Sequence, residues 1–588
     1  MSADVGAVVP IGKDAMLSSG REGSFLFVVH ALTRRTPSDA WTPVTLAHAL
    51  RAYRPVLLES AEGESAVGRH SYVALGRLAE VLFFPDGSFR VLPEEAATAF
   101  SPSRDPEGRE GALFQERPLV EGLSAFSRLF RLAEEAELPS GRFRGGFLFA
   151  AGFELAHVLG REGGVFPPAR RVPGDASAPL LYLVLPEVLL TFDHRRGTLE
   201  WTSFVLFREG AGVEERRAKE AEAQRRLKRL WEASAEARLP LALFEETEDE
   251  ADAVSDALVG EEEEAFLRRV EGVLVAVRKG EVEQVVLSHR MEIPLSELIL
   301  PAKDARGLAP AERLWERAFE AAFLAYRALR HVNPSPYMYF FPVPRDLSRW
   351  EFPSPSQSAF ETGEDFAALL VGSSPEVLFR IERGGEGVRR VLVRPIAGTR
   401  RRGRTPEEDL RMREELLADA KEREEHKQLV RLTFADLAPL VAPGSLALAA
   451  GGVLETYSHV IHLVSQVEGH LLPDVNAWDV FARLFPAGTV LGAPRARALE
   501  LLAEEEGSPR GFYGGAVGFV GFDGEADAAI AIRTLVFRED VVEAQAGAGI
   551  VAGSLPAREA LEIRNKRRVL LTALGVVRSA MRRPASRV

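Results

Sequence analysis

The order of helix-like and strand-like segments constrains the fold of this chain more than any other feature of its sequence. Residues 1 to about 210 contain short apolar runs between Gly and Pro turns, such as RPVLLES and SYVALG, which is the pattern of strands. An amphipathic helix is expected at 262–278, with Phe266, Val270, Val273 and Val277 on one face, and the strand-like run EVEQVVLSHRMEI follows it. Because helices and strands do not alternate regularly, the sequence favours an α+β fold over a parallel α/β sheet.

A change in composition near residue 255 divides the chain. The segment 214–237 is rich in helix formers and poor in apolar residues, and we expect an exposed helix there. The acidic segment EETEDEADAVSDALVGEEEEAF follows, as suits a solvated boundary. We therefore predict an N-terminal region at 1–255 and a second region at 256–588.

The composition excludes several classes of function. The chain has 86 acidic and 73 basic residues and a net charge of −13, which disfavours binding to nucleic acid or to an anionic membrane. It contains no cysteine, so disulfides, thiolate metal sites and a Cys nucleophile are excluded. The longest apolar stretch, PLLYLVLPEVLLTF, is too short to span a membrane and is interrupted by Pro186 and Glu187. With no secretory signal in view, we expect a cytoplasmic protein.

Two pairs of glutamates share the spacing of one helical face. Glu422 and Glu425 lie in KEREEH, and Glu559 and Glu562 repeat the spacing in AREALEIRNK. Either pair alone is typical of a solvated helix. If the two helices face each other, four carboxylates converge, and the pKa values of these carboxyls would rise sharply unless a cation lay between them. Oxygen ligands with room for water suit Mg²⁺.

Three other segments contain candidate anion-binding residues. VRPIAGTRRRGR joins a strand-like entry to a turn at Ala397, Gly398 and Thr399, followed by arginines, and QAGAGIVAGS offers the backbone N–H groups of a Gly-rich loop. GFYGGAVGFVGFDGEADAAIAIRTLVF predicts a hairpin about Asp523-Gly524. It would bring Tyr513 and Arg533 to the same end. Arg533 interrupts the apolar strand AIAIRTLVF, so we expect it to be partly buried and paired with a substrate carboxylate or an internal acid.

Taken in order, the segments resemble the chorismate-utilising enzymes, and among them anthranilate synthase component I. The resemblance spans roughly 260–575, and LLES (57–60) and FRGGFLFAAGFE (143–154) extend it more loosely to the N-terminal half. Its motifs are the run from Gln284 to Arg290, NPSPYM (333–338), GSSPE (372–376), PIAGTR (395–400), KEREEH (421–426), YSHVIHLVSQVEG (457–469), PAGTVLGAP (486–494), FYGGAVGFVGFDG, AIAIRT, GAGIVA and the closing Glu-x-x-Glu-x-x-Asn-Lys.

The resemblance implies a fold and a site. The fold would be two large packed antiparallel sheets with helices outside. Mg²⁺ would be held by Glu425 and Glu562, with Glu422 and Glu559 in support, and would bind the ring carboxylate of chorismate. The enolpyruvyl carboxylate would contact Tyr513, Arg533 and the backbone of Gly547 and Gly549. Glu376 would be the general acid for loss of the 4-hydroxyl. His462 and Thr399 would line the ring beside Ala397 and Gly398. Lys566 would neutralise charge near the metal.

Two positions discriminate between members of the family. Relatives that add water have a Lys where this chain has Gln284, and aminodeoxychorismate synthases have a Lys where it has Ala397. The combination implies amination to anthranilate with release of pyruvate. Because the chain has no Cys, the ammonia would come from a separate glutaminase subunit or from solution. A related aminating enzyme (an aminodeoxyisochorismate or aminodeoxychorismate synthase) and a catalytically weak tryptophan- or glutaminase-binding homologue remain as alternatives.

The resemblance also implies a feedback site for tryptophan. Its two halves would be LLES, with Leu58, Glu59 and Ser60, and NPSPYM, with Asn333, Pro336, Tyr337 and Met338. The chain departs from the family after the metal helix, where Arg431, Phe434 and Ala435 replace Asp, Arg and Asn while Asp436 remains. Gly553 stands where an Asp is common, and the loop at 341–366 is longer.

Overall fold

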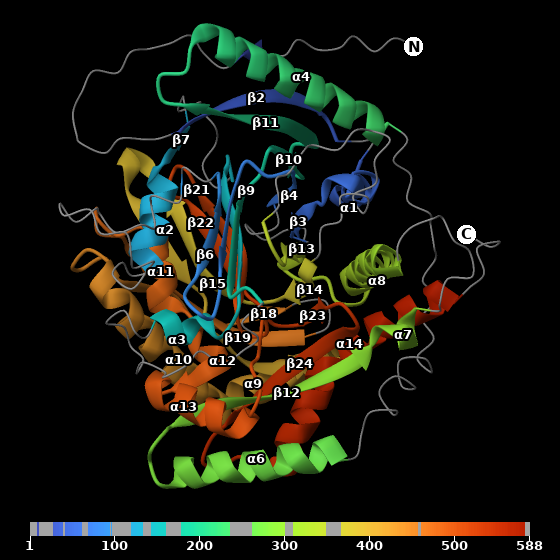
Figure 1. The fold of residues 1–588 in the computed structure, drawn as a ribbon. Coiled ribbons are helices and arrows are strands. Elements are labelled where there is room, and N and C mark those ends of the chain that lie inside the picture. Colours follow the sequence, from blue (N-terminus) through green and yellow to red (C-terminus); the bar gives the residue numbers. More distant parts are fainter. Residues whose placement is uncertain are drawn as a thin grey trace.

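Two large β-sheets packed face to face form the centre of the molecule, with helices around them (Figure 1). The computed structural model describes residues 9–10, 27–38, 41–60, 69–93, 96, 119–132, 143–159, 178–235, 261–299, 310–347, 366–456 and 460–582. The predicted boundary near residue 255, His459 of the motif YSHVIHLVSQVEG and most of the longer loop at 341–366 lie outside these ranges.

The larger sheet has 13 strands and draws on both halves of the chain. Its neighbouring strands are antiparallel apart from a short parallel pair between β2 and β7. In spatial order the strands are β1 (Val9–Pro10), β2 (Phe27–Pro37), β11 (Thr198–Arg208), β10 (Val188–Asp193), β4 (His70–Leu75), β3 (Val56–Glu59), β13 (Tyr337–Pro344), β14 (Phe366–Ser374), β23 (Thr534–Phe537), β24 (Val541–Ile550), β12 (Gln284–Pro294) and β20 (Gly492–Ala493), with β7 (Phe130–Leu132) beside β2.

The smaller sheet has 11 strands and also mixes the two halves. In order they are β17 (Ile396–Arg401), β19 (Val460–His470), β16 (Arg389–Val393), β15 (Val377–Arg383), β22 (Ala526–Ile530), β21 (Ala516–Gly521), β8 (Gly146–Ala151), β9 (Leu181–Leu185), β5 (Ala79–Phe83) and β6 (Phe89–Leu92), with β18 (Ala447–Thr456) beside β19.

Strand β13 shows why the larger sheet is buried on both faces. Successive side chains of a strand point to opposite faces. Tyr339 and Phe341 belong to the core between the sheets, whereas Met338 and Phe340 belong to a second core under the helices. An uninterrupted apolar run, YMYFFPV, satisfies both cores, so this strand lacks the polar alternation of a half-exposed strand.

The helices lie outside the sheets. In Figure 1, α4 (Val213–Ser234) covers β2 and β11 at one end of the molecule, and α6 (Glu261–Arg278) lies at the other end near β12. α14 (Pro556–Arg582) packs on α8 (Pro310–Val332) and on β24. The other α-helices among the described residues are α1 (Pro43–Ala49), α2 (Leu119–Arg128), α3 (Leu155–Leu159), α7 (Leu295–Leu298), α9 (Pro406–Ala418), α10 (Ala420–Leu437), α11 (Ala477–Leu484), α12 (Gly488–Leu491) and α13 (Arg495–Glu506).

The predicted fold class is confirmed, and so is the helix at 262–278, whose four apolar stripe residues are all buried. Two local expectations are wrong. The Gly-rich segment at 545–554 is not a loop over most of its length, because it forms strand β24 as far as Ile550. The run AIAIRTLVF is not one strand. It breaks at Arg533, whose φ of +51° turns the chain from β22 in the smaller sheet to β23 in the larger one.

Candidate active site

Glu376 lies at the tight connection between β14 and β15. The connection is closed by backbone, since Ile530 N donates to the Glu376 carbonyl at 3.0 Å and the Ser374 hydroxyl donates to Ile530 O at 2.7 Å. Glu376 is 8% exposed. Burial raises the pKa of its carboxyl to about 7, although the Thr489 hydroxyl and the Lys566 ammonium both lower it. A carboxyl in this setting can carry a proton at neutral pH.

His462 and Thr399 form the second part of the site, on the paired strands β19 and β17. Thr399 Oγ1 and His462 Nδ1 are 3.0 Å apart. The pairing is irregular between Ala397 and Thr399, where Gly398 adopts a φ of +75°. Burial lowers the pKa of His462 to about 4, so this imidazole is neutral at physiological pH.

Helix α10 places Glu422 against the same turn. A Cβ added to Gly398 would lie 3.2 Å from Glu422 Oε2, and the φ of +75° at this residue favours glycine. The other carboxylate oxygen, Oε1, accepts from Arg400 Nη1 at 3.1 Å. Glu425 follows one turn later on α10 and is half-buried.

Strands β24 and β12 form the third part of the site. A Cβ on Gly547 would lie 2.7 Å from Tyr513 Oη, and one on Gly549 would lie 2.4 Å from Gln284 Nε2. Tyr513 and Gln284 therefore use the space that the two glycines leave open.

The backbone of β24 has a free edge in this part of the sheet. Among the described strands, β23 pairs with β24 only as far as Ala544, while β12 pairs with the opposite edge. Gly547 O accepts from Lys566 Nζ at 2.8 Å, so the carbonyl points away from β12. The N–H of a strand residue points to the same side as its carbonyl, so the Gly547 N–H faces the free edge, and Gly549 follows with the period of two.

Arg533, Tyr513 and the N-terminal turns of α14 belong to the same site. Burial lowers the pKa of the Arg533 guanidinium, while the nearby Tyr513 and Glu562 raise it in part. Lys566 Nζ pairs with Glu562 Oε1 at 2.7 Å. Arg533 is also close enough to contribute to lowering the pKa of His462, which connects this group to the second part of the site. Burial raises the pKa of the Tyr513 hydroxyl to about 12.

The four predicted metal-binding glutamates border this site on two helices. They are not gathered together: within the described ranges, no three acidic or imidazole side chains are placed to hold a metal. Glu422 is paired with Arg400 and Glu562 with Lys566, so each carboxylate is drawn to a cation of the chain. The donor set nevertheless fits Mg²⁺, which takes one or two carboxylates directly and completes its shell with water and substrate oxygens.

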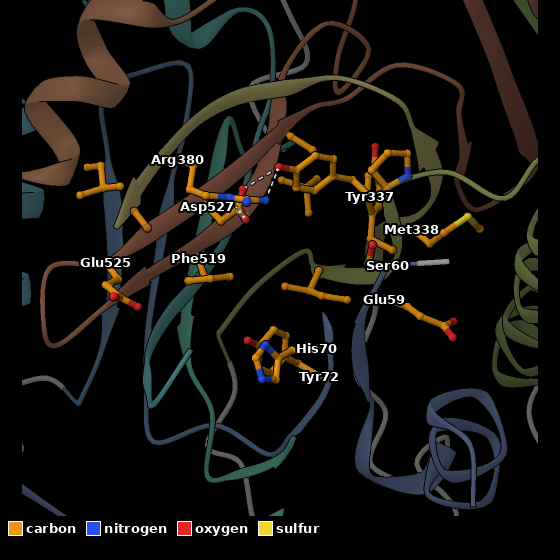
Figure 2. A pocket seen from close by; sticks show the side chains of 18 of the residues that line it. Glu59, Ser60, His70, Tyr72, Tyr337, Met338, Arg380, Phe519, Glu525 and Asp527 are labelled. Atoms are coloured by element: carbon orange, nitrogen blue, oxygen red, sulfur yellow. Dashed lines mark hydrogen bonds and ion pairs between the residues drawn. The ribbon is translucent and has the colours of Figure 1, made fainter. Parts of the chain in front are cut away.

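All but one of the residues predicted to bind tryptophan line a cavity of about 150 Å³ between the sheets (Figure 2). Leu58, Glu59 and Ser60 line it at the end of β3, and Pro336, Tyr337 and Met338 line it at the start of β13. Asn333 does not line the cavity. Its side-chain amide donates to Ser373 Oγ at 3.1 Å and so holds the turn before β13.

Glu59 and Ser60 differ in how their side chains are satisfied. The Glu59 carboxylate is turned away from Arg380 and Asp527 in Figure 2. It accepts from Tyr326 Oη at 2.7 Å and from Arg330 Nη2 at 2.8 Å, so its backbone rather than its charge faces the cavity. Ser60 Oγ is buried and has no hydrogen-bond partner among the described residues. A ligand in the cavity would satisfy it.

A charged pair at one side of this cavity was not predicted from the sequence. Arg380 Nε donates to Asp527 Oδ2 at 2.8 Å, and the Tyr337 hydroxyl donates to Asp527 Oδ1 at 2.9 Å. A signal was present, because Arg380 and Asp527 interrupt the apolar runs VLFRIER and ADAAI. Thr489 beside Glu376 was not predicted either, although the motif PAGTVLGAP contains it.

The atypical segment at 431–435 lies behind the site. Arg431 is exposed and pairs with Glu424, while Phe434 packs against the core between the sheets. Asp436, which the family shares, pairs with Arg495 Nη1 at 3.4 Å. A cavity of about 50 Å³ lies between Glu376 and the helix positions Thr433 and Asp436. Gly553 is in an open turn, where an added Cβ would meet nothing within 4 Å.

Comparisons with known proteins agree with this geometry. The family model described as chorismate binding enzyme matches residues 125–572. Anthranilate synthase component 1 of Thermus thermophilus is 36% identical over 92% of this chain and 97% of its own length. The protein of that name from Geobacillus stearothermophilus is 32% identical over 92% and 93%.

Solved structures show the same arrangement of strands and helices. Anthranilate synthase component I from Streptococcus pneumoniae aligns with a TM-score of 0.56 at 26% identity, covering 86% of this chain and 93% of that one. The menaquinone-specific isochorismate synthase MenF of Escherichia coli shares the fold, with a TM-score of 0.57 at 18% identity over 93% and 94%. No helix within the described ranges is both long and apolar enough to cross a membrane. This chain belongs to the chorismate binding enzyme family, and within it resembles the anthranilate synthase component 1 proteins.

Proposed function

We propose that the chain is the component I subunit of an anthranilate synthase, which converts chorismate and ammonia to anthranilate and pyruvate. The observation that carries the proposal is the convergence of Glu376, Lys566, Tyr513, Arg533 and His462 around β24 and β19. These residues match, position by position, the set that the family resemblance requires.

The chain's own groups account for binding of the substrate. Tyr513, Arg533 and the N–H groups of Gly547 and Gly549 on the free edge of β24 would hold the enolpyruvyl carboxylate by charge-assisted hydrogen bonds. Ala397 and Gly398 leave room for the ring beside Thr399 and His462. Glu376 would protonate the departing 4-hydroxyl, because burial raises the pKa of its carboxyl to about 7 and so leaves a substantial protonated fraction at neutral pH.

Mg²⁺ would be held by Glu425 and Glu562, with Glu422 and Glu559 in support. When bound, it supplies Lewis-acid polarisation of the ring carboxylate, which makes C2 electrophilic. Lys566 lies beside Glu562 and would limit the build-up of negative charge on that side.

Ammonia would attack C2 without a base of its own, since Gln284 stands where water-adding relatives have Lys. A chain without Cys has no thiol nucleophile to hydrolyse glutamine, so the proposal includes a separate glutaminase partner. The expected cytoplasmic location is part of the same proposal.

A turnover assay tests this function. The chain is incubated with chorismate and Mg²⁺, with either ammonium or glutamine as the nitrogen source, and anthranilate fluorescence and pyruvate are followed. We expect turnover with ammonium and none with glutamine. Glu425→Gln should abolish turnover, and Glu424→Gln, one residue away and exposed on α10, is the matched control. An aminated product without pyruvate would instead favour an aminodeoxyisochorismate or aminodeoxychorismate synthase. The absence of any turnover would favour the catalytically weak binding homologue.

We also propose that tryptophan binds the 150 Å³ cavity and inhibits the enzyme. Support comes from the apolar and aromatic lining, including Tyr72 and Phe519, and from the unsatisfied Ser60 hydroxyl. Ser60→Phe should fill the cavity, remove inhibition and leave the uninhibited rate unchanged. A wild-type enzyme indifferent to tryptophan would contradict this part of the proposal.

A further inference from the structure

The arginine tract after the active-site turn is divided between two helices. Arg401 pairs with Glu408 and Arg402 with Asp409, both in the first turn of α9. Arg400 instead reaches Glu422, a candidate metal ligand on α10. One arginine of the tract therefore touches the metal helix, and its neighbours provide controls of the same chemistry.

Arg400 bridges two carboxylates. Its Nη1 donates to Glu422 Oε1 at 3.1 Å, and its Nη2 donates to Asp419 Oδ2 at 2.7 Å. Nη1 also donates to the Thr399 carbonyl at 3.0 Å, which fixes the guanidinium beside the turn. All three side chains are only about a quarter exposed, with values of 26% for Arg400, 30% for Asp419 and 23% for Glu422.

Asp419 has a second function at the start of α10. Its Oδ1 accepts from the backbone N–H of Glu422 at 3.2 Å, in the manner of an N-cap. The residue that caps the metal helix thus also holds the cation that binds its first glutamate. If Glu422 leaves the guanidinium, Asp419 remains as a partner within hydrogen-bond distance.

We propose that Arg400 is a tethered cation that competes with Mg²⁺ for Glu422, and that Asp419 retains it when the metal binds. A carboxylate oxygen that accepts from a guanidinium is less available to a metal ion, because both cations draw on the same charge. The inference rests on the proposed function, since it concerns the metal that this function requires. Arg400 acts through Glu422 and is a positioning residue.

Mg²⁺ titrations monitored by calorimetry in the absence of chorismate test the proposal without any measurement of turnover. Arg400→Gln should lower the Kd for Mg²⁺ about two- to fivefold, as expected from the loss of one partly exposed ion pair. Asp419→Asn keeps the N-cap of α10 but weakens the hold of residue 419 on the Arg400 guanidinium. Arg400 should then stay on Glu422, and the Kd for Mg²⁺ should rise. Arg402→Gln, whose partner is Asp409, should leave the Kd unchanged.

Arg400→Gln and Asp419→Asn should change the Kd for Mg²⁺ in opposite directions. A loss of folding stability in either variant would not reproduce this pattern. An unchanged or higher Kd for folded Arg400→Gln would overturn the proposal, and so would a lower Kd for Asp419→Asn. A wild-type chain that makes anthranilate while these Kd values fail to move would overturn this inference alone. A wild-type chain that makes no anthranilate would instead overturn the proposed function.

Discussion

Glu376 illustrates how a single buried carboxyl can be prepared to deliver a proton. Its backbone is fixed by β14, β15 and Ile530, and burial raises its pKa to about 7. Because the folded-state pKa is raised, the protonated form predominates below about pH 7 and is lost as the pH rises through that value.

We therefore expect kcat/KM for chorismate to fall about tenfold per pH unit above about pH 7 when the concentration of free NH₃ is held constant. The control is Glu376→Gln, whose small residual rate should not show this ionisation. A wild-type profile that stays flat from pH 6 to about pH 9 would contradict the role of Glu376 as the acid.

A substitution at Gly547 tests whether the free edge of β24 binds the substrate. Any Cβ at this position would lie 2.7 Å from Tyr513 Oη and 3.2 Å from Leu287 O, so Gly547→Ala forces Tyr513 to move. Overpacking of this kind costs about 1–3 kcal/mol, which predicts a rise in KM for chorismate of roughly five- to 150-fold. Gly553→Ala in the same QAGAGIVAGS segment meets nothing within 4 Å and should leave KM unchanged. Equal KM values for the two variants would show that the free edge of β24 does not bind substrate.

At the scale of elements, a buried guanidinium connects three parts of the active-site wall. Arg510 Nη1 donates to Val490 O in α12 at 2.7 Å, and its Nη2 donates to Val286 O in β12 at 2.6 Å. Glu506 at the end of α13 accepts from Arg510 Nε at 2.7 Å. The side chain of Arg510 is only 2% exposed, so its pairing with Glu506 is shielded from water.

Arg510→Gln should lower the free energy of unfolding by about 3–5 kcal/mol, because it leaves Glu506 buried without its cation. The measurement is the midpoint of denaturant unfolding. Arg497→Gln, on α13 with partly exposed partners, should change the free energy by less than about 0.5 kcal/mol. A similarly small effect at Arg510 would mean that the pair contributes little to the stability of the site wall.

Some helices and strands could be predicted from the sequence and others could not. The helix at 262–278 was predictable because its apolar spacing is local. The Gly-rich segment was not predictable as a strand, because glycine is depleted in strands and the reason for it here is the approach of Tyr513 and Gln284 from other elements. The break at Arg533 follows from a crossing between sheets, which no pattern in AIAIRTLVF reports.

For the whole molecule, the sequence predicted two packed sheets but not how the two halves share them. β13 pairs with β3, and β21 pairs with β8, so each sheet joins strands that lie far apart in sequence. Strand order depends on such distant pairings, which local composition does not encode. The site residues were identified through the family motifs, whereas the Arg400 bridge and the Arg380–Asp527 pair depend on contacts between separate strands and helices.

The shared sheets predict that the halves depend on each other for folding. A fragment of residues 256–588 should be largely unfolded or aggregated, because β13 and β21 would expose unpaired edges. Co-expression with residues 1–255 should restore a soluble complex with the thermal transition of the intact chain. A soluble, cooperatively folded fragment of 256–588 alone would contradict this reading of the fold.

The most direct test of the central claim is the identity and stoichiometry of the products. The chain is supplied with chorismate, Mg²⁺ and ¹⁵N-ammonium, and the products are identified by mass spectrometry. We predict anthranilate that carries the ¹⁵N label and an equal amount of pyruvate. Labelled aminodeoxychorismate or aminodeoxyisochorismate with the enolpyruvyl group retained, or no labelled product at all, would contradict it.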